Sequence, residues 1–115
     1  MAVFHEKDVV GMKIEIPAAK NVLKKSVVTP ETGWDDQVMR IFEIGEGGHT
    51  PKHQHPWYHV NYIIEGTGIL NIDGEDNPVE PGSVAYVPED LMHQFVNTGK
   101  GTLKFICIVP EEGDV

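Results

Sequence analysis

The sequence predicts an all-β domain in which short antiparallel strands close into a sandwich or barrel. Short stretches of alternating apolar and polar residues recur along most of the 115 residues, and turn signals rich in Gly, Pro, Asp and Asn separate them. No stretch has a convincing helical period, the best candidate being the short segment 17–23. A chain of this length forms one domain and can bury a hydrophobic core without the help of disulfides.

The N-terminal part of the chain is expected to form an arm that ends in an edge strand. Residues 22–28 mix β-branched side chains with Lys24 and Lys25, a composition that suits such a strand. We expect the cluster of Lys20, Lys24 and Lys25 to be a solvated guard on that edge. A turn over residues 29–33 follows.

The single domain therefore divides into an arm with its edge strand, residues 1–28, and a barrel, residues 29–115. Alternation over residues 37–44 predicts the first barrel strand, which Gly47 and Gly48 should end. A short strand carrying two histidines comes next, and Asp73-Gly74 is a strong hairpin signal. The other expected strands are residues 59–65, 69–72, 83–87, 92–96 and 103–109.

The composition restricts the partners and the compartment. A formal net charge of −9 argues against nucleic acid and anionic membranes as partners. The longest apolar run is too short to cross a membrane. Cys107 is the single cysteine and the N-terminus lacks a signal-peptide pattern, so we expect a cytoplasmic protein. The acidic tail over residues 111–114 is expected to be frayed.

Four histidines carry most of the functional information. His53, His55 and His59 fall within seven residues, and His93 lies further along the chain. Neutral imidazole is a common ligand of borderline transition metals. Alternate residues of a strand share a face, so His53 and His55 can converge on one ion, to which His59 can return from the next strand. A metal-free polar core is the alternative, but it would need partners for eight ring nitrogens.

Two spaced motifs give the sequence a resemblance to the cupins, small jelly-roll β-barrels. The first motif, a Gly, five residues, His-x-His, an acidic ligand and a second Gly, is matched by Gly47, His53, His55, His59 and Gly66. The second is matched by Gly82, Pro88, Asp90, His93 and Asn97. The resemblance implies a jelly-roll fold, also called a double-stranded β-helix.

The sequence departs from the motifs at two positions. His59 stands where the family has a Glu ligand, and Asp90 stands where it has a Gly. Asp tolerates unusual turn geometry, so Asp90 is expected to be a turn variant. The substitution at His59 makes the chain similar to small single-domain cupins with a four-histidine site, some of which bind manganese.

This resemblance implies one divalent metal ion per chain, with manganese expected first and iron, zinc, nickel or copper as alternatives. Four neutral ligands leave the ion its full charge, which would make it a strong Lewis acid. Raw affinity does not select manganese, so the supply of metals in the cell would decide which ion is bound. Because the imidazoles must be neutral, we expect metal loss below about pH 6.

Three further residues are candidate catalytic groups. Arg40 either points outward with a packed stem or points inward to hold a substrate carboxylate, and the resemblance favours the second. Asn61 shares a face with His59 and either packs or hydrogen-bonds a ligand. Cys107 is a reactive thiol or, more simply, a small buried hydrophobe. His49 is interpreted as a surface residue.

The predicted function is a metal-dependent oxygenase that acts on a small organic substrate. The alternatives are a metal-assisted binding protein for a sugar or organic acid, and a metal-dependent isomerase or lyase, which would need a general base that the motifs do not supply. A fold does not settle a function. We also expect a homodimer, since N-terminal arms of this kind often pair across a two-fold axis.

Overall fold

The computed structural model describes residues 3–114, which form a curved nine-stranded sheet, and among them no α-helix occurs. The strands are β1 (Met12–Lys13), β2 (Lys20–Val28), β3 (Gln37–His49), β4 (His59–Glu65), β5 (Gly68–Ile72), β6 (Glu75–Val79), β7 (Val84–Val87), β8 (His93–Val96) and β9 (Leu103–Pro110). Three short 3-10 turns accompany them, η1 (Glu6–Asp8), η2 (Pro30–Thr32) and η3 (Glu111–Gly113). The predicted all-β class is confirmed.

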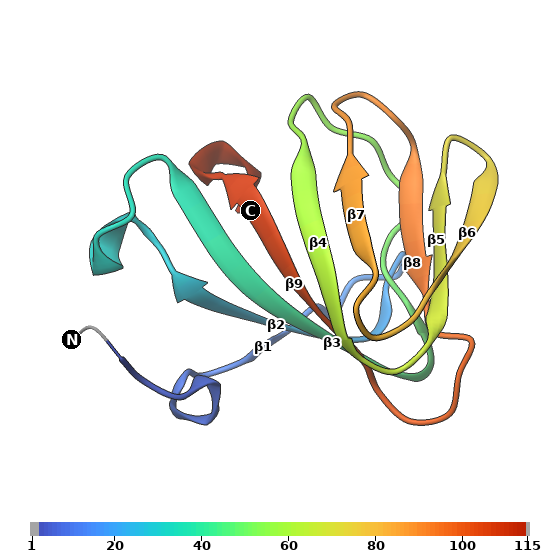
Figure 1. Cartoon of the computed structure of the whole chain (residues 1–115), viewed down its shortest axis with the longest axis horizontal. Helices are drawn as coiled ribbons and strands as arrows, with labels where there is room; N and C mark the ends of the chain where they lie inside the picture. The colour runs from blue at the N-terminus through green and yellow to red at the C-terminus, as the bar shows by residue number, and fades with distance from the viewer. Residues whose placement is uncertain (1–2, 115) are drawn as a thin grey trace.

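The strands of the curved sheet do not pair in sequence order. The order is β6-β5-β8-β3-β9-β4-β7, with β2 hydrogen-bonded to β3 and β1 to β2. Figure 1 shows β5, β6 and β8 on one side of the open barrel and β2, β3 and β9 on the other. The barrel is therefore a half-barrel whose concave face is free to hold a site.

Strand β3 joins the two sides, and it is longer than the sequence predicted. Its body pairs with β2 and β9, and His49 at its end pairs with Val96 of β8. The glycines expected to end the strand lie inside it, and Gly47 has φ +76°. A positive φ lets the chain bend sharply without a Cβ clash, so the glycine turns the strand instead of ending it.

Segment 17–23 is not helical. Strand β2 already begins at Lys20, and its pairing with β3 supplies the hydrogen bonds that a single helical turn could not. The arm before it is folded onto the same chain, where the carboxylate of Glu6 lies 2.8 Å from Lys104 Nζ. Val10 and Met12 remain exposed on this arm. The expected homodimer stays a prediction.

Alternation along the strands creates the inner surface. In β4 the residues His59, Asn61 and Ile63 are all buried, while the alternate residues Tyr62 and Ile64 are exposed. Across the sheet, strand register places Arg40 beside Cys107, and Cys107 beside Asn61. Polar side chains thus form a row across three neighbouring strands on the concave face. No described residue belongs to a helix long and apolar enough to cross a membrane.

Candidate metal centre and its pocket

The four predicted histidines converge, but His53 and His55 do not lie on one strand as expected. His59 begins β4 and His93 begins β8. His53 forms an isolated antiparallel bridge with His93, in which each backbone N–H donates to the other carbonyl at 3.1 and 2.8 Å. His55 lies in the following loop, so the two do not share a strand.

The loop that carries His55 is fixed by the second motif. The backbone N–H of Asp90 donates to the His55 carbonyl at 2.8 Å. Asp90 has φ +65°, which confirms the expected turn variant. The two motifs are therefore joined by backbone hydrogen bonds at His53 and at His55.

The side chains of these histidines are close enough to share one ion. Ligand atoms of His53, His55 and His93 all lie within 4.8 Å of one another. His59 joins them through its Nε2 atom, which lies 3.1 Å from Nε2 of His93. Two nitrogens bound at right angles to one ion at about 2.1 Å lie about 3 Å apart, so this separation fits two ligands of a single metal. The cluster could hold a divalent metal ion.

Hydrogen bonds fix the protonation of three rings. Nδ1 of His93 lies 2.9 Å from the Leu91 carbonyl, and Nδ1 of His55 lies 2.9 Å from the Trp57 carbonyl. A carbonyl can only accept, so both Nδ1 atoms carry the proton and both Nε2 atoms present a lone pair. Such outer partners commonly orient metal-binding histidines.

Asn61 fixes which ring nitrogen of His59 carries the proton. Its Oδ1 lies 2.6 Å from Nδ1 of His59, while its Nδ2 donates to the Ile106 carbonyl at 3.4 Å. The amide orientation makes Oδ1 the acceptor, so Nε2 of His59 also presents a lone pair. Two lone pairs therefore face each other across 3.1 Å between His59 and His93. A cation between them would relieve that repulsion.

A proton is a poor candidate for this cation. Burial of the ring, followed by the charge of His93, lowers the pKa of His59 to about 3. Burial followed by His93 and His55 lowers the pKa of His53 to about 4. The pKa of His93 is also lowered, chiefly by burial. At neutral pH His53, His59 and His93 are therefore neutral donors, as a metal site requires.

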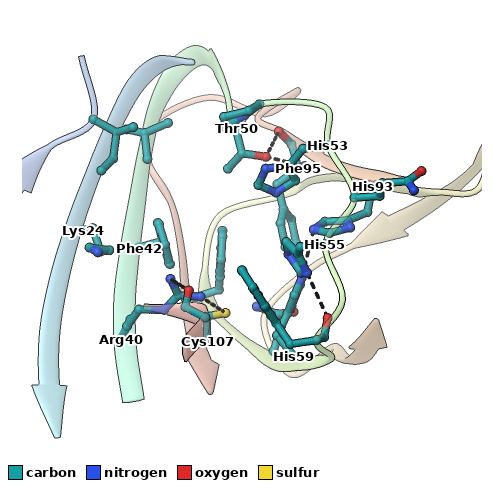
Figure 2. A pocket seen from close by; sticks show the side chains of 18 of the residues that line it. Lys24, Arg40, Phe42, Thr50, His53, His55, His59, His93, Phe95 and Cys107 are labelled. Atoms are coloured by element: carbon teal, nitrogen blue, oxygen red, sulfur yellow. Dashed lines mark hydrogen bonds between the residues drawn. The ribbon is translucent and has the colours of Figure 1, made fainter. Parts of the chain in front are cut away.

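The histidines form one end of a cavity of about 410 Å³. Aromatic rings make its walls, with Phe95 and Phe105 stacked at 4.1 Å and Phe42 and Phe105 at 5.5 Å between ring centroids. Figure 2 shows the histidines on one side of this cavity and Lys24, Arg40 and Cys107 on the other. The cavity therefore has a histidine end, an aromatic middle and a cationic end.

Of the two orientations considered for Arg40, the structure shows the inward one. Its side chain points into the cavity and is 8% exposed. Nη2 donates to the Cys107 sulfur at 3.0 Å and Nη1 to the Gly113 carbonyl at 3.4 Å. The guanidinium carbon also lies 4.9 Å from the centre of the Phe42 ring.

Lys24 and Asp114 are functional candidates that sequence reasoning missed. Lys24 is 8% exposed and lines the cavity, so it is not the solvated edge residue that we expected. Its Nζ lies 3.0 Å from Asp114 Oδ1, so the acidic tail is anchored at this residue and not frayed. The alternation that placed Asn61 inward also places Lys24 inward, two residues from the buried Val22.

Cys107 lies in the cavity wall but outside the group of ligand atoms found among residues 3–114. Burial raises the pKa of its thiol, although the nearby Arg40 acts in the opposite direction. A protonated thiol is a weak nucleophile. His49 hydrogen-bonds locally and is likewise outside the group.

Comparison with known protein families supports the same architecture. A family model described as a cupin domain matches residues 40–109, which is more than half of the chain. The structure is also similar to the polyketide cyclase RemF from Streptomyces resistomycificus, with a TM-score of 0.88 and 30% identity over 96% of this chain and 80% of that one. The predicted jelly-roll fold is confirmed.

Curated relatives have diverse roles. The chain is 32% identical over 76 residues to the 1-methylthio-D-xylulose 5-phosphate methylsulfurylase of Rhodospirillum rubrum. The matched stretch covers 66% of this chain and 49% of that protein. It is 28% identical over 68 residues to the oxalate-binding protein of Thermotoga maritima, 58% and 56% of the two chains. The chain thus spans about half the length of the curated relatives it matches.

Proposed function

The chain belongs to the cupin family, and from this premise we propose that it is a metal-dependent enzyme for a small organic substrate. The observation that carries the proposal is the pair of Nε2 lone pairs that face each other across 3.1 Å in His59 and His93. His53 and His55 would complete the ligand set, with His55 oriented by the Trp57 carbonyl. When bound, the ion would supply Lewis acidity toward a substrate oxygen.

We propose manganese as the native metal, on the strength of the four-histidine motif. Iron, zinc, nickel and copper are the alternatives, because nitrogen ligands alone do not discriminate among these ions. The neutral cluster favours binding of any of them at neutral pH.

The remaining cavity residues would bind and orient the substrate. The Phe42, Phe95 and Phe105 rings offer flat apolar walls, which suit an unsaturated or aromatic body. Arg40 would hold an anionic group at the opposite end from the histidines. The cavity lining contains no Asp or Glu among the described residues. Because the ligands cannot serve as a free general base, this composition favours an oxygenase over proton-transfer chemistry.

A non-oxidative cyclisation or elimination is the second candidate. It is favoured by the likeness to a polyketide cyclase over nearly the whole chain, and by a dimethylsulfoniopropionate lyase from Ruegeria pomeroyi among the relatives, 34% identical over 66 residues. That likeness covers 57% of this chain and 43% of the lyase.

The test combines metal analysis with a comparison of turnover in air and without oxygen. Elemental analysis of protein purified without a His tag should give about one equivalent of metal per chain. His53→Ala should lower metal affinity by about 100-fold or more, whereas the matched variant His49→Ala should not change it, since His49 lies outside the cluster.

A panel of small aromatic and unsaturated acids would then be incubated with the loaded protein. Consumption of dioxygen supports the oxygenase, and conversion under argon supports the second candidate. Saturable binding without product in either condition would replace the enzyme by a binding protein. Absence of metal after reconstitution would overturn the proposal altogether.

A further inference from the structure

A carboxylate of the chain itself lies against the cationic end of the cavity, behind the lining residues Lys24 and Arg40. Asp114 follows the η3 turn, and its Oδ1 lies 3.0 Å from Lys24 Nζ. Ser26 Oγ donates to the same carboxylate at 3.2 Å to Oδ2. Asp114 is thus bound as an anionic ligand would be, by side chains on the concave face of β2.

Arg40 lies beside this carboxylate, but its guanidinium donates no hydrogen bond to it. Its Nη1 lies 3.7 Å from Asp114 Oδ1, beyond hydrogen-bonding distance. Its own hydrogen bonds go to a thiol and to a backbone carbonyl, both weaker acceptors than a carboxylate. Its Nε is buried and has no hydrogen-bond partner among the described residues. A buried donor without a partner is costly, so it indicates a place for a ligand acceptor.

We propose that Lys24, Ser26 and Arg40 form an anion-binding subsite that Asp114 occupies from within the chain, and that a substrate carboxylate binds Arg40 in competition with Asp114. This proposal deepens the proposed function and rests on it, because only that function makes the bound carboxylic acid a substrate. The substrate class it names is a small carboxylic acid with a flat apolar body. Its carboxylate would lie at the cationic end, and its other end would face the histidines.

Competition follows from the charges and the distances. A second carboxylate on Arg40 would lie close to Asp114, whose Oδ1 is 3.7 Å from the guanidinium, and like charges this close repel each other. Asp114 is not sealed in the core, because its side chain keeps 19% of its surface exposed. The residue can therefore yield toward solvent, whereas Arg40, 8% exposed, cannot leave the cavity wall.

The experiment measures charge preference with two probes of nearly the same shape, benzoate and benzamide. Binding would be followed by titration calorimetry on the full chain, both with its metal and after chelation. We expect benzoate to bind the unmodified protein about tenfold more tightly than benzamide. Asp114→Asn should strengthen benzoate binding by about threefold or more and leave benzamide binding unchanged, because it removes the competing charge.

Glu112→Gln is the matched control. It removes one negative charge from the same turn, at an exposed position, and should leave both affinities unchanged. Arg40→Gln should reduce the benzoate preference to about one. If that variant does not fold, Arg40→Lys replaces it and should keep only part of the preference, since a single ammonium group lacks the fork of donors.

Equal binding of the two probes by the unmodified protein would overturn the subsite. A weakening of benzoate binding in Asp114→Asn, or an equal strengthening in Glu112→Gln, would overturn the competition. The chelated protein separates this inference from the proposed function. A benzoate preference that persists after chelation would support the subsite independently of the metal, whereas failure of the reconstituted protein to bind metal would overturn only the metalloenzyme.

Discussion

The two ends of the cavity differ in how the sequence builds them. The histidine end takes its ligands from residues 53–93, at spacings that define two motifs. The cationic end joins β2, β3, β9 and the η3 turn, through residues that are up to ninety positions apart, as Lys24 and Asp114 are. The first end is held by backbone hydrogen bonds between motifs, and the second by side-chain charges.

This difference has a functional consequence. At the histidine end, carbonyl and amide acceptors fix the orientation of the His55, His59 and His93 rings. The cationic end is charged, and Arg40 Nε within it has no hydrogen-bond partner among residues 3–114. A metal site needs fixed geometry, whereas a subsite that receives and releases an anion needs an exchangeable partner. This difference supports the proposal that the histidine end carries the chemistry and that the cationic end selects the substrate.

Acidification should affect the histidine end most strongly. The pKa of His59 is about 3 in the folded chain and 6.5 in an ordinary environment, so below pH 6.5 the unfolded chain binds a proton that the folded chain does not. Stability is therefore complete above pH 6.5 and falls as the pH drops. Between pH 7 and pH 5, His59 alone should remove about 2 kcal/mol from the unfolding free energy of the metal-free protein.

Urea denaturation at both pH values would measure this loss, and the lowered pKa of the buried His93 should add to it. The variant His59→Asn should lose less stability over the same interval. Equal stability at pH 7 and pH 5 would contradict the lowered pKa of the buried His59.

Removal of an outer partner should weaken the histidine end without removing a ligand. In Asn61→Leu, Nδ1 of His59 loses its acceptor at 2.6 Å, so the ring can rotate or protonate at the wrong nitrogen. We expect metal affinity to fall by about 10- to 100-fold. Competition with a chromogenic chelator would measure it. Asn61→Asp keeps an acceptor and should restore most of the affinity, so an equal loss in both variants would indicate a packing role only.

A further prediction concerns the turn at the cationic end. A Cβ added to Gly113 would lie 2.8 Å from Nε1 of Trp57, whose ring stacks on His55 at 4.6 Å. In Gly113→Ala the turn must shift, which should lower the unfolding free energy by about 1–3 kcal/mol. Glu112→Ala on the exposed side of the turn should stay within about 0.5 kcal/mol of the unmodified protein.

Metal affinity in Gly113→Ala sharpens the comparison further. It should change by less than about threefold, since His55 is held by the Trp57 carbonyl and by Asp90, and not by the turn. A loss as large as that of Asn61→Leu would show that the two ends are not independent.

Much of the histidine end could be predicted, because its information is local. The counts between Gly47, His53, His59 and Gly66 set which side chains meet, and the positive φ of Asp90 follows from the residue's own tolerance. The prediction that His53 and His55 share a strand was wrong. Local spacing could not show that His53 pairs with His93, because that bridge is made across the barrel.

The sequence by itself determined the all-β class, the family, the four converging histidines and the inward face that Asn61 shares with His59. Only the tertiary structure decided the orientation of Arg40, the burial of Lys24 and the anchoring of Asp114. The physical reason is the kind of interaction involved. Strand periodicity and turn conformation are properties of neighbouring residues, whereas a buried charge is tolerated only where the fold brings its partner. For Lys24 and Arg40 that partner comes from the η3 turn, and no local pattern marks it.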